Sequence, residues 1–92
     1  MENITGKTSS GFEYSYDERV LKDWDFITLL GTLTDKEVKE PVKLSNTRKL
    51  LFILLGEEQT NKLIAHIREL NDGFAPVEEV MKEVGEITSS KN

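Results

Sequence analysis

The stretch L-L-F-I-L-L-G-E-E-Q, residues 50–59, decides the fold. Its first six residues are all apolar, which is too many for one face of a surface helix, so residues 46–55 are expected to form a central, buried helix. Gly56 can adopt the backbone conformation that ends a helix. The acidic pair that follows, Glu57 and Glu58, suits the positive end of the dipole of a new helix. The sequence therefore predicts two helices that meet at Gly56.

On the C-terminal side, apolar residues at helical spacing predict that the second of these helices continues to about Leu70. The turn N-D-G at residues 71–73 stops it. Pro76 is expected at the first position of a last helix. The apolar stripe of that helix comprises Val77, Val80, Met81, Val84 and Ile87.

On the N-terminal side, Asp17 can cap a helix that runs to about Leu33. Apolar residues recur three or four positions apart along it, and Trp24 among them is expected in the core. Residues 34–41 offer only one apolar side chain, so they are expected to connect helices without adding to the core.

The first sixteen residues are not helical in pattern. Residues 1–11 are rich in Ser, Thr and Gly and are expected to be a flexible segment. Residues 12–16, F-E-Y-S-Y, alternate aromatic with polar residues and predict a short strand or an extended arm. The expected fold is mainly α: a small bundle of about four helices with this N-terminal strand or arm. Residues 12–88 would form a single helical domain, and residues 89–92 a frayed tail.

Composition narrows the function. The 92 residues are 37% hydrophobic and 32% charged, a globular balance, with a formal net charge of -5. This charge opposes binding to nucleic acid or to an anionic membrane. No apolar run is long enough to span a bilayer and no signal-peptide core is present, so a cytoplasmic location is expected. The absence of cysteine excludes disulfides and thiolate sites.

No catalytic, metal or cofactor site is expected. The lone histidine, His66, lies at the edge of an apolar helix face and is interpreted as a boundary packing residue. The many carboxylates stand where helix starts and solvent-facing surfaces favour acids, including Glu83 on the last helix. Neither a calcium-binding loop nor a glycine-rich phosphate-binding motif occurs. An enzyme is therefore not predicted.

Two groups of residues are candidates for partner binding. A lone strand leaves its backbone free to pair with another chain, so the strand carrying Phe12, Tyr14 and Tyr16 is the first candidate. The alternative is that these aromatics cover the helical core. The second candidate is a basic cluster in and after the connection, which either is a solvated loop or docks an acidic partner. Its candidate residues are Lys36, Lys39 and Lys43.

The tight junction at Gly56 leaves one alternative function open, a small helix-turn-helix regulator that binds DNA. The second helix of such a motif presents its first turn to the major groove. Here that turn begins with Glu57 and Glu58, which a phosphate-lined groove would repel.

Four segments resemble a known family. They are S-G-F-E-Y-S-Y-D (10–17), D-W-D-F-I-T-L-L (23–30), L-L-F-I-L-L-G-E-E-Q (50–59) and L-N-D-G-F-A-P-V-E-E-V (70–80). Together they resemble the short tail assembly chaperones of long-tailed phages and prophages of Gram-positive bacteria. The resemblance spans residues 10–87 in the same order, and none of its segments is a catalytic motif.

The resemblance implies a mainly helical, non-catalytic protein of the host cytoplasm that is absent from the mature virion. Such a protein binds the tape measure protein, keeps it soluble and helps to recruit tail tube protein during tail morphogenesis. The resemblance also implies a longer form made by ribosomal frameshifting. Pairing of the strand at residues 12–16 with a second copy of the chain would give self-association. No site residue is carried over from the family.

Overall fold

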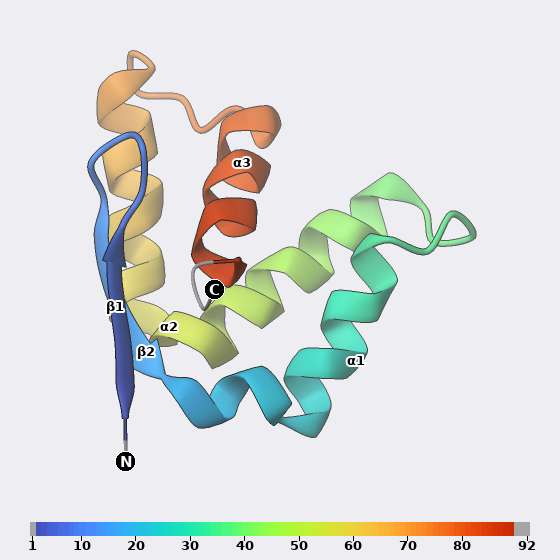
Figure 1. Cartoon of the computed structure of the whole chain (residues 1–92). Helices are drawn as coiled ribbons and strands as arrows, with labels where there is room; N and C mark the ends of the chain where they lie inside the picture. The colour runs from blue at the N-terminus through green and yellow to red at the C-terminus, as the bar shows by residue number, and fades with distance from the viewer. Residues whose placement is uncertain (1, 90–92) are drawn as a thin grey trace.

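The computed structural model describes residues 2–89, and this part of the chain is mostly helical (Figure 1). The elements follow in the order β1 (Asn3–Lys7), β2 (Glu13–Asp17), the 3-10 helix η1 (Glu18–Lys22), α1 (Trp24–Leu33), α2 (Glu40–Leu70) and α3 (Val77–Thr88). The prediction of a helical fold with an N-terminal strand is confirmed in this form. The prediction of about four helices is not, because the described residues form three α-helices.

The difference arises at Gly56, where α2 bends instead of ending. Gly56 has φ 83° and ψ 165°, a conformation that is nearly restricted to glycine. The hydroxyl of Thr60 donates across the bend to the carbonyl oxygens of Leu51, at 3.1 Å, and Gly56, at 2.8 Å. The predicted change of direction is therefore present within a single element of residues 40–70, which begins six residues earlier than expected.

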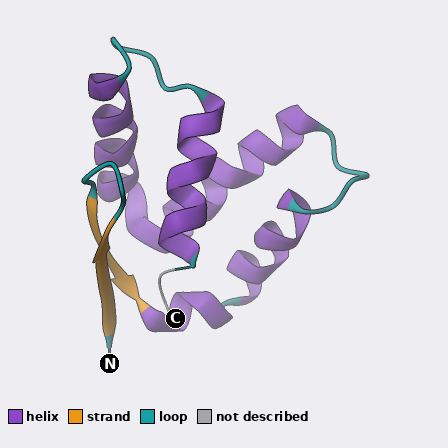
Figure 2. Cartoon of the chain, turned by 45° about the horizontal axis from the view of Figure 1, so that its top comes forward, coloured by secondary structure: helices purple, strands orange, loops and turns teal. Residues whose placement is uncertain are grey.

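The core forms where the two halves of α2 meet α1, α3 and the strands. Figure 2 shows α3 lying between the two halves of α2, with α1 alongside the first half. Leu50 from the first half, Leu63 from the second and Ile87 from α3 have no exposed surface. Phe26 of α1 completes this centre. Deep burial of these side chains is the main contribution that holds the helices together.

The segment predicted to be flexible contains a strand instead. β1 pairs antiparallel with β2, with Ile4 opposite Tyr16 and Gly6 opposite Tyr14. The Tyr14 ring lies so close over Gly6 that a Cβ atom there would be 2.6 Å from Tyr14 Cζ. The prediction of a mobile segment over residues 1–11 is therefore wrong for residues 3–7, because β2 provides hydrogen-bond partners for their backbone. Ser89 caps α3, while the rest of the predicted frayed tail lies outside the described residues.

The helix predicted from Asp17 to Leu33 is interrupted at Asp23. Asp17 does cap a helix, but this is the 3-10 helix η1. The Asp23 carboxylate then accepts hydrogen bonds from the backbone N–H groups of Asp25, at 3.0 Å, and Phe26, at 3.2 Å. This second cap restarts the helix in a new phase, so that Phe26 faces the core and Trp24 is 82% exposed. The prediction of a buried Trp24 is wrong for this reason.

The Glu86 carboxylate on α3 forms hydrogen bonds with the turn between the strands. Glu86 accepts two hydrogen bonds of 2.7 Å from Ser9, one from its backbone N–H and one from its hydroxyl. These bonds favour the charged form and hold the pKa of Glu86 below its ordinary value of 4.5. The contact links two segments that are 77 residues apart in the sequence.

Glu86 is expected to make stability fall with acid. Its folded pKa is depressed, so its contribution is present above pH 4.5 and is lost as the pH falls through the folded value. Urea unfolding between pH 6 and pH 3 measures this, with Glu86→Gln as the comparison. The variant should lose less stability over this range than the parent chain. Parallel curves for the two proteins would contradict the assigned role.

Candidate functional site

The three aromatic residues predicted to bind a partner are buried. Phe12 is 7% exposed, Tyr14 6% and Tyr16 4%. The Tyr16 hydroxyl donates to the carbonyl oxygen of Ile87, at 3.3 Å, on the far end of the chain. The prediction of a free aromatic arm is therefore wrong, and the alternative that these rings cover the helical core is confirmed.

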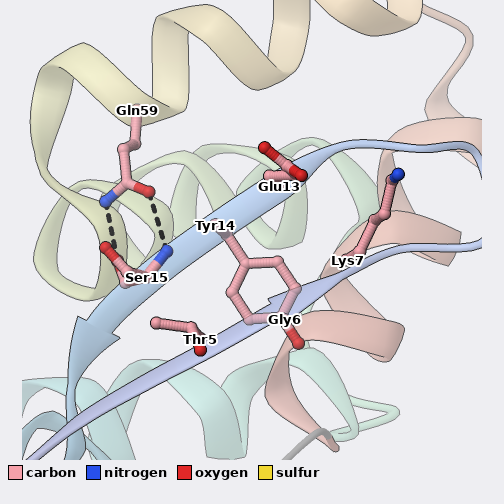
Figure 3. A pocket seen from close by; sticks show the side chains of 7 residues that line it. All are labelled: Thr5, Gly6, Lys7, Glu13, Tyr14, Ser15 and Gln59. Carbon is pink, nitrogen blue, oxygen red and sulfur yellow. Dashed lines mark hydrogen bonds between the residues drawn. The ribbon is translucent and has the colours of Figure 1, made fainter.

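At its central residue, Ser15, the backbone of β2 is also covered on the edge away from β1. One edge pairs with β1, and the side-chain amide of Gln59 covers the other at Ser15 (Figure 3). Gln59 Oε1 accepts from the Ser15 N–H at 2.9 Å, and Gln59 Nε2 donates to the Ser15 carbonyl at 2.7 Å. The amide thus makes the bonds that a neighbouring strand would make. A single glutamine gives no sequence signal for such a role.

A shallow hollow of about 550 Å³ lies over the two strands (Figure 3). Its charged lining residues, Lys7 and Glu13, are both exposed. Within residues 2–89 no hydrogen bond joins the Ser15 hydroxyl to either of them, so no nucleophile and base are brought together there. The hollow carries no evident chemistry.

A more enclosed groove of about 240 Å³ lies between the two halves of α2 and α3. Two threonines line it, but their hydroxyls donate within the chain: Thr47 to the Lys43 carbonyl at 2.8 Å, and Thr60 to Leu51. The groove surface is therefore apolar in character, apart from Arg48 and Arg68. The other lining residues are Leu44, Leu51, Ile64, Ala75, Val77, Val80 and Met81.

Exposed apolar side chains also occur where the groove meets the turn between α2 and α3. Val77 lines the groove and is 46% exposed, and Phe74, next in sequence to the groove residue Ala75, is 71% exposed. We call the groove and these exposed side chains the apolar surface. Clustered exposed apolar area of this kind is typical of a site where another molecule binds. From the sequence, Val77, Val80 and Met81 were expected in the core, so this site was not predicted.

A second exposed apolar position lies on the outer side of α1. Trp24 is 82% exposed and Ile27 49% exposed. A separate hollow nearby is lined by Leu29, Phe52 and Ile53 together with Asp25, Thr28 and Lys49. The exposed ring of Trp24 does not line it.

The basic candidates are spread over the start of α2. Lys36 lies in the preceding turn, Lys39 is the residue that caps α2, and Lys43 follows one turn later. Lys36 and Lys39 are exposed, whereas Lys43 is half-buried. Binding of an acidic partner by these three residues stays a prediction.

His66 and Glu83 are the buried or half-buried titratable residues of note. His66 Nε2 lies 3.2 Å from the Ser10 hydroxyl oxygen and 3.1 Å from the Ser10 carbonyl oxygen, and its ring lies 5.8 Å from that of Phe12. It packs at the boundary of the core, as predicted. Glu83 is only 2% exposed, and its Oε1 has no hydrogen-bond partner among the described residues. The prediction of a solvated Glu83 is wrong, because α3 turns this residue inward.

Two further findings concern residues 2–89 alone. Their histidine, aspartate and glutamate side chains nowhere gather in threes that could hold a metal ion. None of their helices has both the length and the apolar character needed to cross a membrane.

Comparisons with protein-family models, with curated protein sequences and with solved structures gave no match.

Proposed function

We propose that this chain is a tail assembly chaperone, a non-catalytic protein that binds the tape measure protein of a long-tailed phage. The apolar surface formed by the groove with Val77 and the adjacent Phe74 is the observation that carries the proposal. A tape measure protein is a long helical chain whose apolar positions are open before the tube surrounds them. A surface of this kind can cover them reversibly.

The charge of the chain supports the same role. At a formal net charge of -5, copies bound along one tape measure protein would repel each other and keep the complex dispersed. Release would need only competition by tail tube protein, because no chemical step is involved. In this proposal the chain acts in the host cytoplasm, remains outside the mature virion and has a longer frameshifted form as a further partner.

The DNA-binding alternative gains no support from the structure. After the bend at Gly56, the second half of α2 begins with Glu57 and Glu58, both exposed. A helix that starts with two exposed carboxylates would be repelled by the phosphates that line the major groove.

Co-purification tests the proposal against this alternative. The tagged chain, produced together with the tape measure and tail tube proteins of the same phage, is expected to retain the tape measure protein. It is expected to show no affinity for duplex DNA at physiological salt. Salt-sensitive micromolar binding to DNA, with no retention of the tape measure protein, would contradict the proposal.

A further inference from the structure

We propose that the groove between the two halves of α2 and α3 binds an acidic amphipathic helix. An apolar side chain of that helix enters the groove, and its flanking carboxylates meet Arg48 and Arg68. The inference deepens the proposed function and rests on it, because it specifies which segments of a partner the chain recognises.

The size and lining of the groove define the part of the partner that enters it. Its volume of about 240 Å³ lies below the roughly 300–1,000 Å³ that is usual for small-molecule sites, and suits one or two side chains. The hydroxyls of Thr47 and Thr60 are already bonded within the chain, so a polar group entering the groove would find few partners. An apolar side chain has no hydrogen bonds to lose when it enters the groove.

The occupant must also satisfy its own backbone. All lining residues of the groove except Ala75 lie in α2 or α3, whose backbone groups bond within each helix away from its ends, and none of them belongs to a strand. An extended peptide laid on this site would leave its own N–H and C=O groups without partners. A helix bonds its backbone internally and presents side chains three or four residues apart, which can reach both the groove and the neighbouring Phe74 and Val77.

The charged side chains at the groove indicate which residues flank the apolar stripe of that helix. The chain has 12 basic and 17 acidic residues, yet the two charged side chains that line the groove are both arginines. Arg48 lies over the Phe52 ring, 5.3 Å from its centroid, and Arg68 donates to the Gly73 carbonyl at 3.1 Å. These contacts orient the guanidinium groups and leave further N–H donors.

Carboxylates of the chain itself do not neutralise this site. Within the described residues neither arginine forms an ion pair with a carboxylate. Glu78 and Glu79 begin α3 close to Val77, but they do not line the groove. A helix with carboxylates beside its apolar stripe therefore complements the site, whereas a helix with lysines at those positions does not.

Two synthetic helical peptides with the same apolar stripe test this inference. One carries glutamates beside the stripe and the other carries lysines. Fluorescence anisotropy at low and at physiological salt measures their affinities for the whole chain. The glutamate peptide is expected to bind roughly twofold to thirtyfold more tightly, since two partly exposed ion pairs are gained. The preference should shrink as salt rises.

Charge reversal with a matched control identifies the groove. Arg48→Glu combined with Arg68→Glu should reverse the preference between the peptides. Lys7→Glu combined with Lys22→Glu makes the same change in net charge at two exposed residues outside the groove and should leave the preference unchanged. Met81→Glu, which places a carboxylate in the groove, should weaken the binding of the glutamate peptide. Circular dichroism of each variant shows whether it is folded.

The outcomes separate this inference from the proposed function. Equal affinity for both peptides, no binding of either, or equal effects of the arginine and lysine variants would overturn the inference. If the chain still co-purifies with the tape measure protein in that case, the chaperone proposal stands on another surface. A clear charge preference together with a failure to retain the tape measure protein would overturn the chaperone proposal and leave the groove as a helix-binding site.

Discussion

Tyr14→Ser combined with Tyr16→Ser is expected to unfold the chain. Both rings are at least nine-tenths buried, and they stack on each other with centroids 6.0 Å apart. Removing a buried large aromatic side chain costs about 3–5 kcal/mol, so two such losses rival the roughly 5–15 kcal/mol that stabilises a whole domain. Thermal melts followed by circular dichroism should show a lost or strongly lowered transition.

The matched control is the exposed aromatic residue on α1. Trp24→Ser removes a larger ring, but this ring is 82% exposed. Its free energy of unfolding should stay within about 0.5 kcal/mol of the parent value. Similar melts for the Trp24 variant and the double tyrosine variant would show that the strands do not cover the core.

Gly56→Ala is expected to lower the free energy of unfolding by about 1–3 kcal/mol, because φ 83° and ψ 165° are strained for any residue with a Cβ atom. Nothing lies within 4 Å of the position that this Cβ would take, so the cost comes from the backbone alone. Urea unfolding measures it.

The same substitution within regular helices should have the opposite sign. Gly31 in α1 and Gly85 in α3 have ordinary helical backbone and open space for a Cβ atom. Gly31→Ala and Gly85→Ala should each raise stability by about 0.5–1 kcal/mol. A Gly56→Ala variant that is as stable as these two would mean that α2 can run straight through residue 56.

The helical part of the fold was largely predictable from local signals. Apolar spacing located the second half of α2 and all of α3, and the turn at 71–73 ends α2 as expected. Asp72 and Gly73 there have positive φ angles, which Asp and Gly tolerate well. These features depend on neighbours within a few residues, so the sequence expresses them directly.

The errors concern features that depend on distant partners. β1 has one apolar residue, Ile4, and becomes a strand because Tyr14 and Tyr16 lie opposite it. The position of Trp24 changed because the cap at Asp23 reset the phase of the helix. The groove could not be predicted, because it depends on how far α3 covers α2 and leaves Val80 and Met81 only half-buried.

The chain is expected to cover apolar helical segments of a tape measure protein without any chemical step. Light scattering measures this directly, when denatured tape measure protein is diluted into buffer with or without the chain and without nucleotide. Scattering is expected to fall as the chain is added, and to recover when Met81→Glu replaces the parent chain. Aggregation that is unchanged by an excess of the folded parent chain would contradict the account.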